Sequence, residues 1–287
     1  MVLRLCGLAL ALASAACYGV AVVVQAAEAR AVPRASGPRA GLLLRLAARP
    51  KWWLGTAIGI AGWPLQTAAL TIAPIGLVQP ALAAAPVIVL VLAVRMLGEH
   101  AGVRELLGVG GIGAGVVVVT VLGPRGHAAA SVADAGIVVA ALCAFALLPT
   151  AVRFGERAGG LQVVAGAGLA FAASGIASKV TADGLAANAA GVIAIGIGLA
   201  ALTSLVGVSA EMSAYQRITA NVVAPITFAL EIGVPVALAP WLTHSGRGAS
   251  ELAATVAGLM LVVAGVALLA SGPAVSHVTG AAGAHGA

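Results

Sequence analysis

The chain has 287 residues, of which 61% are hydrophobic and 8% charged, and its mean hydropathy is +1.10. Soluble domains contain roughly a quarter charged residues, so this composition excludes an ordinary soluble fold and indicates an integral membrane protein surrounded by lipid. The net charge of +6 does not indicate a nucleic-acid partner, because four Phe, four Trp and two Tyr are too few to interleave a basic patch with aromatic rings.

Apolar runs of about 20 residues, the length that carries an α-helix across a bilayer, follow one another along the chain. Because lipid offers no hydrogen-bond partners, each run must satisfy its own backbone groups, which predicts an all-α polytopic membrane protein. The first run is interpreted as a membrane span and not as a cleaved signal peptide, since further spans follow it. The nine predicted transmembrane helices are Leu5–Gln25, Trp52–Ala73, Gly76–Leu97, Val103–Gly123, Val132–Val152, Leu161–Val180, Ala190–Ala210, Ile218–Trp241 and Leu252–Ser271.

The loop 26–51, after the first span, mixes Pro33 and Pro38 with six basic residues, and Leu42–Ala48 is expected to form a short helix on the anionic inner leaflet. Basic residues are retained on the cytoplasmic side, so we expect a multi-pass protein of the cell (plasma) membrane with its N-terminus outside. Its C-terminus is then cytoplasmic, and residues 272–287 are predicted to be a disordered tail. This orientation places eleven basic residues inside and four outside. Those inside are Arg30, Arg34, Arg39, Arg45, Arg49, Lys51, Arg95, Arg104, Arg153, Arg157 and Arg217, and those outside are Arg4, Arg125, Lys179 and Arg247.

An internal repeat appears when the chain is aligned with itself at an offset of 145 residues. Spans 1–4, within residues 1–130, then pair with spans 6–9, within residues 160–271, while the fifth span, in the connecting segment 131–159, has no counterpart. The odd number of crossings between the halves predicts inverted repeats, an arrangement typical of secondary transporters. The identical pairs are Gly62/Gly207, Ala69/Ala214, Val78/Val223 and Pro80/Pro225.

Ionisable side chains inside a span are costly and are therefore candidates for function. Glu231 lies near the centre of the eighth span, where a carboxylate can bind a cation or carry a proton. Glu211 falls at the cytoplasmic end of the seventh span and corresponds to Gln66 in the first repeat, although pairing with Arg217 is a simpler role for it.

Neutral oxygen ligands are expected from Gln66, Gln79, Asn221 and Thr227, each of which helix-to-helix hydrogen bonding explains as well. We expect the loop residues Glu99, His100, Arg104 and Glu105 to form solvated pairs of little energetic value. Motifs for zinc, nucleotide phosphate or a catalytic nucleophile are absent from the sequence, so neither an enzyme nor a cofactor is expected.

Several short motifs stand out in the two repeats. They are Trp52-Trp53, Gly62, Ala73-Pro74, Leu77-Val78, Pro80 and Gly98-Glu99 in the first repeat, and Glu211-Met212, Val222-Val223 and Pro225 in the second. Through these motifs the chain resembles the drug/metabolite transporter (EamA-like) superfamily, and within it the NIPA-type magnesium transporters, over roughly residues 5–271. At one position it departs from the NIPA-type pattern, because Trp63 stands where an acidic residue follows the glycine equivalent to Gly62.

The resemblance implies nine spans and alternating access, and it leaves the substrate open. The leading hypothesis is a secondary transporter of a small solute or cation, coupled through Glu231. The alternatives are a lipid flippase and a non-transporting scaffold or lipid-binding protein that acts through the basic loop. The expected partners are membrane lipids and a small-molecule or ion substrate, and the oligomeric state is left open, with a homodimer as one arrangement.

Overall fold

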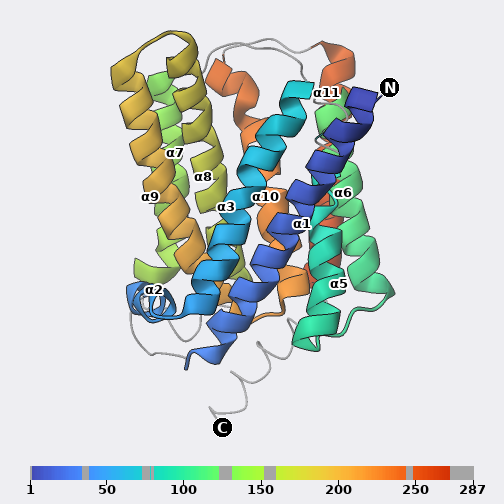
Figure 1. The fold of residues 1–287 in the computed structure, drawn as a ribbon. Helices are drawn as coiled ribbons and strands as arrows, with labels where there is room; N and C mark the ends of the chain where they lie inside the picture. Colours follow the sequence, from blue (N-terminus) through green and yellow to red (C-terminus); the bar gives the residue numbers. More distant parts are fainter. Residues whose placement is uncertain are drawn as a thin grey trace.

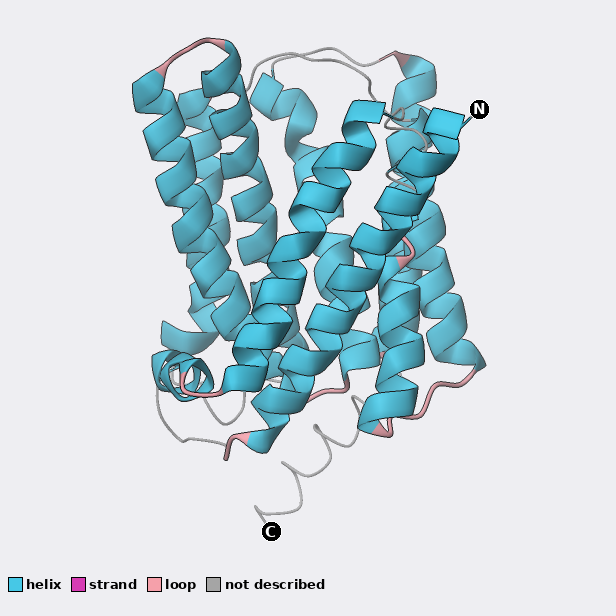
Figure 2. Cartoon of the chain, in the orientation of Figure 1, coloured by secondary structure: helices cyan, strands magenta, loops and turns pink. Residues whose placement is uncertain are grey.

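The computed structural model describes residues 2–33, 39–72, 78, 81–122, 131–151, 160–243 and 248–271. Within these residues all regular secondary structure is helical and no strand occurs (Figure 2). The helices are α1 (Val2–Ala31), α2 (Arg39–Ala47), α3 (Pro50–Ile72), α5 (Ala85–Leu97), α6 (Val103–Leu122), α7 (Val132–Ala151), α8 (Gly160–Ala186), α9 (Ala190–Tyr215), α10 (Ala220–Thr243) and α11 (Ala249–Ala270).

Six of these helices (α1, α6, α8, α9, α10 and α11) are long and apolar enough to cross a membrane. Helix α5 and the apolar part of α7 are shorter, and the predicted span that begins at Gly76 is described only in part. The prediction of a helical membrane protein is therefore confirmed, while the count of nine crossings stays a prediction. The predicted tail, residues 272–287, lies outside the described residues.

The helices pack as antiparallel pairs around a central helix (Figure 1). Helix α1 pairs with α3, α8 pairs with α9, and α6 pairs with α11. Helix α10 contacts α1, α5, α6, α8, α9 and α11, so it occupies the middle of the bundle. Residues on α10 are therefore surrounded by other helices, which makes this helix the natural place for a buried site.

Glycines bring α6 and α11 into direct backbone contact. A Cβ built on Gly115 would lie 2.5 Å from the carbonyl oxygen of Gly258, and one built on Gly265 would lie 2.6 Å from that of Gly108. Small residues at such spacings let helix backbones approach closely in lipid, where there is little hydrophobic drive between helices. Gly108 lies against Gly265 and Gly115 lies against Gly258, so α6 and α11 run in opposite directions.

The two ends of the bundle differ in charge. Helix α2 lies across one end, which we call the basic end (Figure 1), and α1 begins at the other, the N-terminal end. The predicted surface helix is confirmed with the bounds of α2, and its Leu42 and Leu46 are buried against the bundle while Leu44 is 74% exposed. Of the described basic side chains, Arg4 and Lys179 lie toward the N-terminal end, whereas those at the basic end are Arg30, Arg45, Arg49, Lys51, Arg95, Arg104 and Arg217.

The hydrophobic core is also unequal between the two ends. At the basic end and in the middle, one continuous cluster contains residues of α1, α2, α3, α5, α6, α8, α9, α10 and α11. Among the described residues, the core toward the N-terminal end forms two separate clusters. One contains residues of α1, α3 and α5 with Val78, Ala81 and Leu82, and the other contains residues of α7, α8 and α10 with partly buried residues of α9. The described core is thus continuous at the basic end and divided at the N-terminal end.

Candidate functional site

Glu231 lies at the centre of the bundle and its side chain is nevertheless exposed. It is the twelfth of the 24 residues of α10, the helix that contacts six others. Residues 220–227 of α10 are all buried, whereas those from Leu230 to Leu238 are all exposed or partly exposed. Glu231 therefore lies where the tightly packed half of α10 gives way to the loosely packed half.

Tyr18 and Gln66 face this carboxylate from the other side of the bundle. The Tyr18 hydroxyl on α1 donates a hydrogen bond to Gln66 Oε1 on α3, at 3.0 Å, and Glu231 is close enough to act electrostatically on that hydroxyl. The Tyr18 ring lies against Gly62, where an added Cβ would come within 2.8 Å of Cε1. Glycine at position 62 therefore makes room for the Tyr18 ring. The three helices contribute three polar groups, the phenol of Tyr18 from α1, the amide of Gln66 from α3 and the carboxylate of Glu231 from α10.

Glu211, the second predicted carboxylate, is buried on α9 and hydrogen-bonded within its own helix. The Tyr215 hydroxyl donates to Glu211 Oε1 at 2.7 Å, and the predicted pairing of Glu211 with Arg217 stays a prediction. Glu211 is 8% exposed and Tyr215 is 1% exposed. Neither carboxylate forms an ion pair within the part of the chain that the structure describes.

Thr227 lies one turn below Glu231 on the same face of α10, because residues four apart are neighbours on a helix. It is 4% exposed, and its hydroxyl oxygen is enclosed without a hydrogen-bond partner. The other threonines with described side chains inside helices donate to the carbonyl four residues earlier, at 2.8–3.0 Å. These are Thr56, Thr120, Thr181, Thr203 and Thr255. The Thr227 hydroxyl thus does not make the hydrogen bond to the carbonyl four residues earlier that the other helical threonines make.

The remaining predicted ligands are not gathered around Glu231. Asn221 begins α10 at the basic end, ten residues or about 15 Å from Glu231 along the helix. It is 1% exposed, and its Nδ2 donates to the His100 carbonyl at 3.0 Å while its Oδ1 has no partner. Gln79 lies outside the described residues. The structure therefore places Thr227 one turn from Glu231 and Asn221 at the basic end, while Gln66 bonds Tyr18, the residue on which Glu231 acts electrostatically.

The expectation of solvated pairs in the loop after α5 is wrong for its two glutamates. Glu99 is 7% exposed and pairs with Arg30 of α1, and Glu105 is 9% exposed and accepts from the Gly102 N–H at 2.8 Å. Arg104 donates to the hydroxyl of Ser271 instead of pairing within the loop. The sequence did not single out Glu99 or Tyr18 as functional residues. Glu99 is charged but lies in a loop, and Tyr18 lies in a predicted span but carries no charge.

Among the described residues, no three His, Cys, Asp or Glu side chains cluster as a metal site would require. No family model, no curated protein and no solved structure matches the chain. The fold and the site define the chain as a helical membrane protein whose central carboxylate, Glu231, has no ion-pair partner among the described residues. Its resemblance to drug/metabolite transporters stays a prediction from the sequence motifs.

Proposed function

We propose that the chain is a secondary transporter that moves a small cation or cation-coupled solute by alternating access, with Glu231 as the binding carboxylate. The observation that carries the proposal is the division of the core, which is continuous at the basic end and split in two at the N-terminal end. A transporter open on one side needs this division, because its substrate must reach the midplane from that side while the other stays closed. Glu231 lies at the boundary between the two regions.

The helix contacts support the inverted repeats and the nine crossings that belong to this proposal. The pairs α1–α3, α1–α5 and α5–α6 in the first half have counterparts in α8–α9, α8–α10 and α10–α11 in the second. The contacts α5–α10 and α6–α11 join equivalent helices of the two halves, as a pseudo-two-fold axis requires. Helix α1 runs toward the basic end and α8 away from it (Figure 1), so the halves have opposite orientations.

The repeat is supported at the level of single residues as well. Gly62 and Gly207, which the 145-residue offset aligns, each lie against an aromatic ring of the preceding long helix of their own half. An added Cβ would approach the Tyr18 ring to 2.8 Å at Gly62 and the Phe171 ring to 2.9 Å at Gly207. Glycines aligned by the offset thus each receive an aromatic ring from the preceding long helix. Two halves of matching architecture can exchange conformations to open either side.

The chemistry of the centre favours a cationic ligand or a proton. A carboxylate away from bulk water is expensive unless it is neutralised by a proton, a bound cation or a nearby positive side chain. Within the described residues Glu231 has no ion-pair partner, so an external cation or proton would supply the missing charge. We take the basic end as cytoplasmic and the membrane as the cell membrane, because basic residues are retained on the cytoplasmic side.

The test uses purified protein in lipid vesicles that contain a pH-sensitive dye. Magnesium ion is added outside in one arm and a small organic ammonium ion in another, and the change in internal pH is followed for Glu231→Gln beside the unmodified protein. We expect a solute-dependent pH change in at least one arm and its loss in Glu231→Gln. Glu251→Gln is the matched control, since Glu251 lies in the first turn of α11, away from the centre, and should retain the signal.

Two results would contradict the proposal. One is a signal from the unmodified protein that does not exceed that of empty vesicles in either arm. The other is an undiminished signal from Glu231→Gln, which would mean that the central carboxylate takes no part in coupling.

A further inference from the structure

The closed end of the bundle is organised around the turn between α9 and α10, residues 216–219. Arg30, at the C-terminal end of α1, donates from Nε to the Tyr215 carbonyl at 3.1 Å and from Nη2 to the Ile218 carbonyl at 3.4 Å. Glu99, just after α5, accepts from the backbone N–H groups of Ala220 at 2.6 Å and Asn221 at 2.9 Å. Arg30 and Glu99 also form an ion pair with each other.

The signs of these charges match the helix ends that they contact. The last carbonyls of a helix carry partial negative charge and its first N–H groups partial positive charge, so Arg30 suits the end of α9 and Glu99 suits the start of α10. Gly98 ends α5 with φ +65°, a left-handed conformation that glycine adopts without strain, and the chain then leaves the helix at Glu99. One ion pair thus caps two helices at once.

This ion pair joins the two halves of the molecule. Arg30 and Glu99 belong to the first half, whereas the groups that they bind at the ends of α9 and α10 belong to the second. The other ion pairs of the described residues lie within a single half. Glu28 pairs with Arg49 in the first, and Lys179 pairs with Asp183 in the second.

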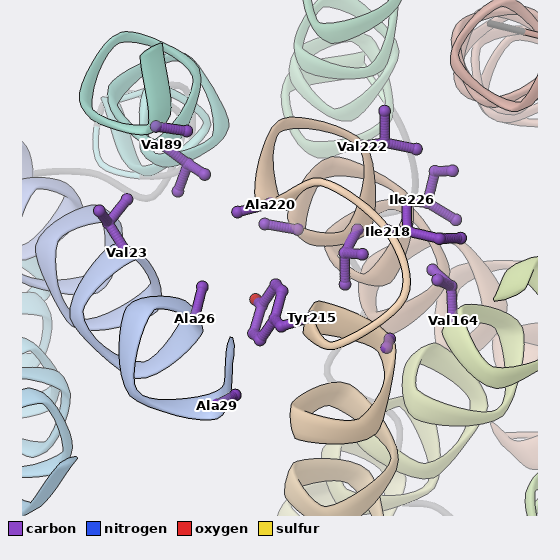
Figure 3. Close-up of a cluster of buried hydrophobic side chains, with 14 of the residues drawn as sticks. Val23, Ala26, Ala29, Val89, Val164, Tyr215, Ile218, Ala220, Val222 and Ile226 are labelled. Carbon is purple, nitrogen blue, oxygen red and sulfur yellow. The ribbon is translucent and has the colours of Figure 1, made fainter. Parts of the chain in front are cut away.

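The surroundings of the pair are closed on one side and open on the other. Tyr215 packs between α1 and the start of α10, with Val23 and Ala26 facing it from α1 (Figure 3). The Glu99 side chain is 2% exposed, while that of Arg30 is 29% exposed and borders a shallow cavity of about 180 Å³ at the basic end. Water can therefore reach the pair from the basic end, on the Arg30 side, and solvate it when it separates.

We propose that the Arg30–Glu99 pair is the latch of the basic end, so that the bundle opens on this side only when α9 and α10 leave the pair. The inference rests on the proposed function and identifies the contact that alternating access must break and remake. Opening the basic end separates the α9–α10 turn from α1 and α5. Neutral hydrogen bonds also oppose this separation, from Gln216 to the Ala29 and Val32 carbonyls at 2.9 and 3.0 Å and from Asn221 to the His100 carbonyl at 3.0 Å. The described charged contacts that oppose it are those of Arg30 and Glu99. Weakening the pair shifts the population toward the state open at the basic end.

The test measures water access to two introduced cysteines and needs no substrate. In a background with Cys6, Cys17 and Cys143 replaced by alanine, Val23→Cys reports on the closed core, because Val23 is fully buried about two turns from Arg30. Ala237→Cys reports on the N-terminal end, where the described core is divided, because Ala237 is exposed on the half of α10 that lies nearer that end. A membrane-impermeant maleimide is added to the protein in detergent micelles, and the labelling rates are compared.

We expect Glu99→Gln to raise the labelling rate at Val23→Cys by about tenfold or more, since breaking a buried charge pair is among the largest single-residue effects. Labelling at Ala237→Cys should fall in the same variant. Arg30→Lys, which keeps the charge but loses the Nε donor, should give a smaller rise. Glu28→Gln is the matched control, because it breaks a part-buried ion pair at the same end within one half, and it should change neither rate.

Each outcome has a definite meaning. Unchanged labelling at Val23→Cys in monodisperse Glu99→Gln and Arg30→Lys protein would overturn the latch and leave the vesicle assay of transport unaffected. An equal rise in Glu28→Gln would also overturn it, because the effect would then be general loosening of the basic end. A rise at Val23→Cys without a fall at Ala237→Cys would support the latch and contradict alternating access.

Discussion

Replacing Gly115 with alanine perturbs the direct backbone contact between α6 and α11. The added Cβ would lie 2.5 Å from the Gly258 carbonyl oxygen and 2.9 Å from the Val262 backbone nitrogen, both well inside van der Waals contact. Backbone atoms cannot swing aside as a flexible side chain does, so α6 and α11 must separate along the contact. Overpacking of this kind costs about 1–3 kcal/mol, and we expect Gly115→Ala to lower the free energy of unfolding by that amount.

Gly110 provides a matched control on the same helix. An added Cβ there meets nothing within 4 Å, so Gly110→Ala should be neutral or should stabilise α6 by up to about 1 kcal/mol through helix propensity. The free energy of unfolding of both variants is measured by titrating SDS into protein in mixed micelles while following helicity. Equal stability of Gly115→Ala and Gly110→Ala would refute the argument that backbone contact between α6 and α11 holds the halves together.

Two further predictions concern polar groups near Glu231. Thr227→Val should leave the free energy of unfolding unchanged or raise it by up to about 1 kcal/mol, because it removes a buried hydroxyl without a partner. Thr255→Val is the control, because it removes a hydrogen-bonded hydroxyl and should lower the free energy of unfolding by about 1 kcal/mol. Equal losses in Thr227→Val and Thr255→Val would contradict the prediction, because they would show that the Thr227 hydroxyl is hydrogen-bonded. Tyr18→Phe keeps the ring against Gly62 but loses the bond to Gln66, so it should cost about 1 kcal/mol in the same SDS titration, and no cost would contradict the bond.

The sequence was sufficient for the features that depend on composition and local pattern. Apolar runs of membrane length predicted the helices, and the uneven distribution of Lys and Arg predicted a bundle with one basic end. The short helix after the first span was also predicted, within the leucine-rich stretch Leu42–Ala48 of the basic loop. Each of these properties is set by residues close together in the chain.

The sequence also identified Glu231 and Gln66, since a polar side chain inside an apolar run is conspicuous. It did not identify Tyr18, which as an aromatic residue in a span gives no signal until the fold places its hydroxyl at 3.0 Å from Gln66 Oε1. For Asn221 the sequence predicted a ligand of the centre, and the structure places it at the basic end. Distance from Glu231 is a property of the packed bundle and not of residue type.

Glu99 shows most clearly what tertiary structure decided. In the sequence it is one of four polar residues in a short loop, and such residues are usually solvated. Its partners, Arg30 and the start of α10, are 69 and 121 residues away, and only the packing of α1, α5, α9 and α10 brings them to its carboxylate. Sequence by itself determined which segments are apolar helices of membrane length, because this depends on local hydropathy. The fold decided at which end the described core is continuous and which charges meet there, because those depend on contacts between distant segments.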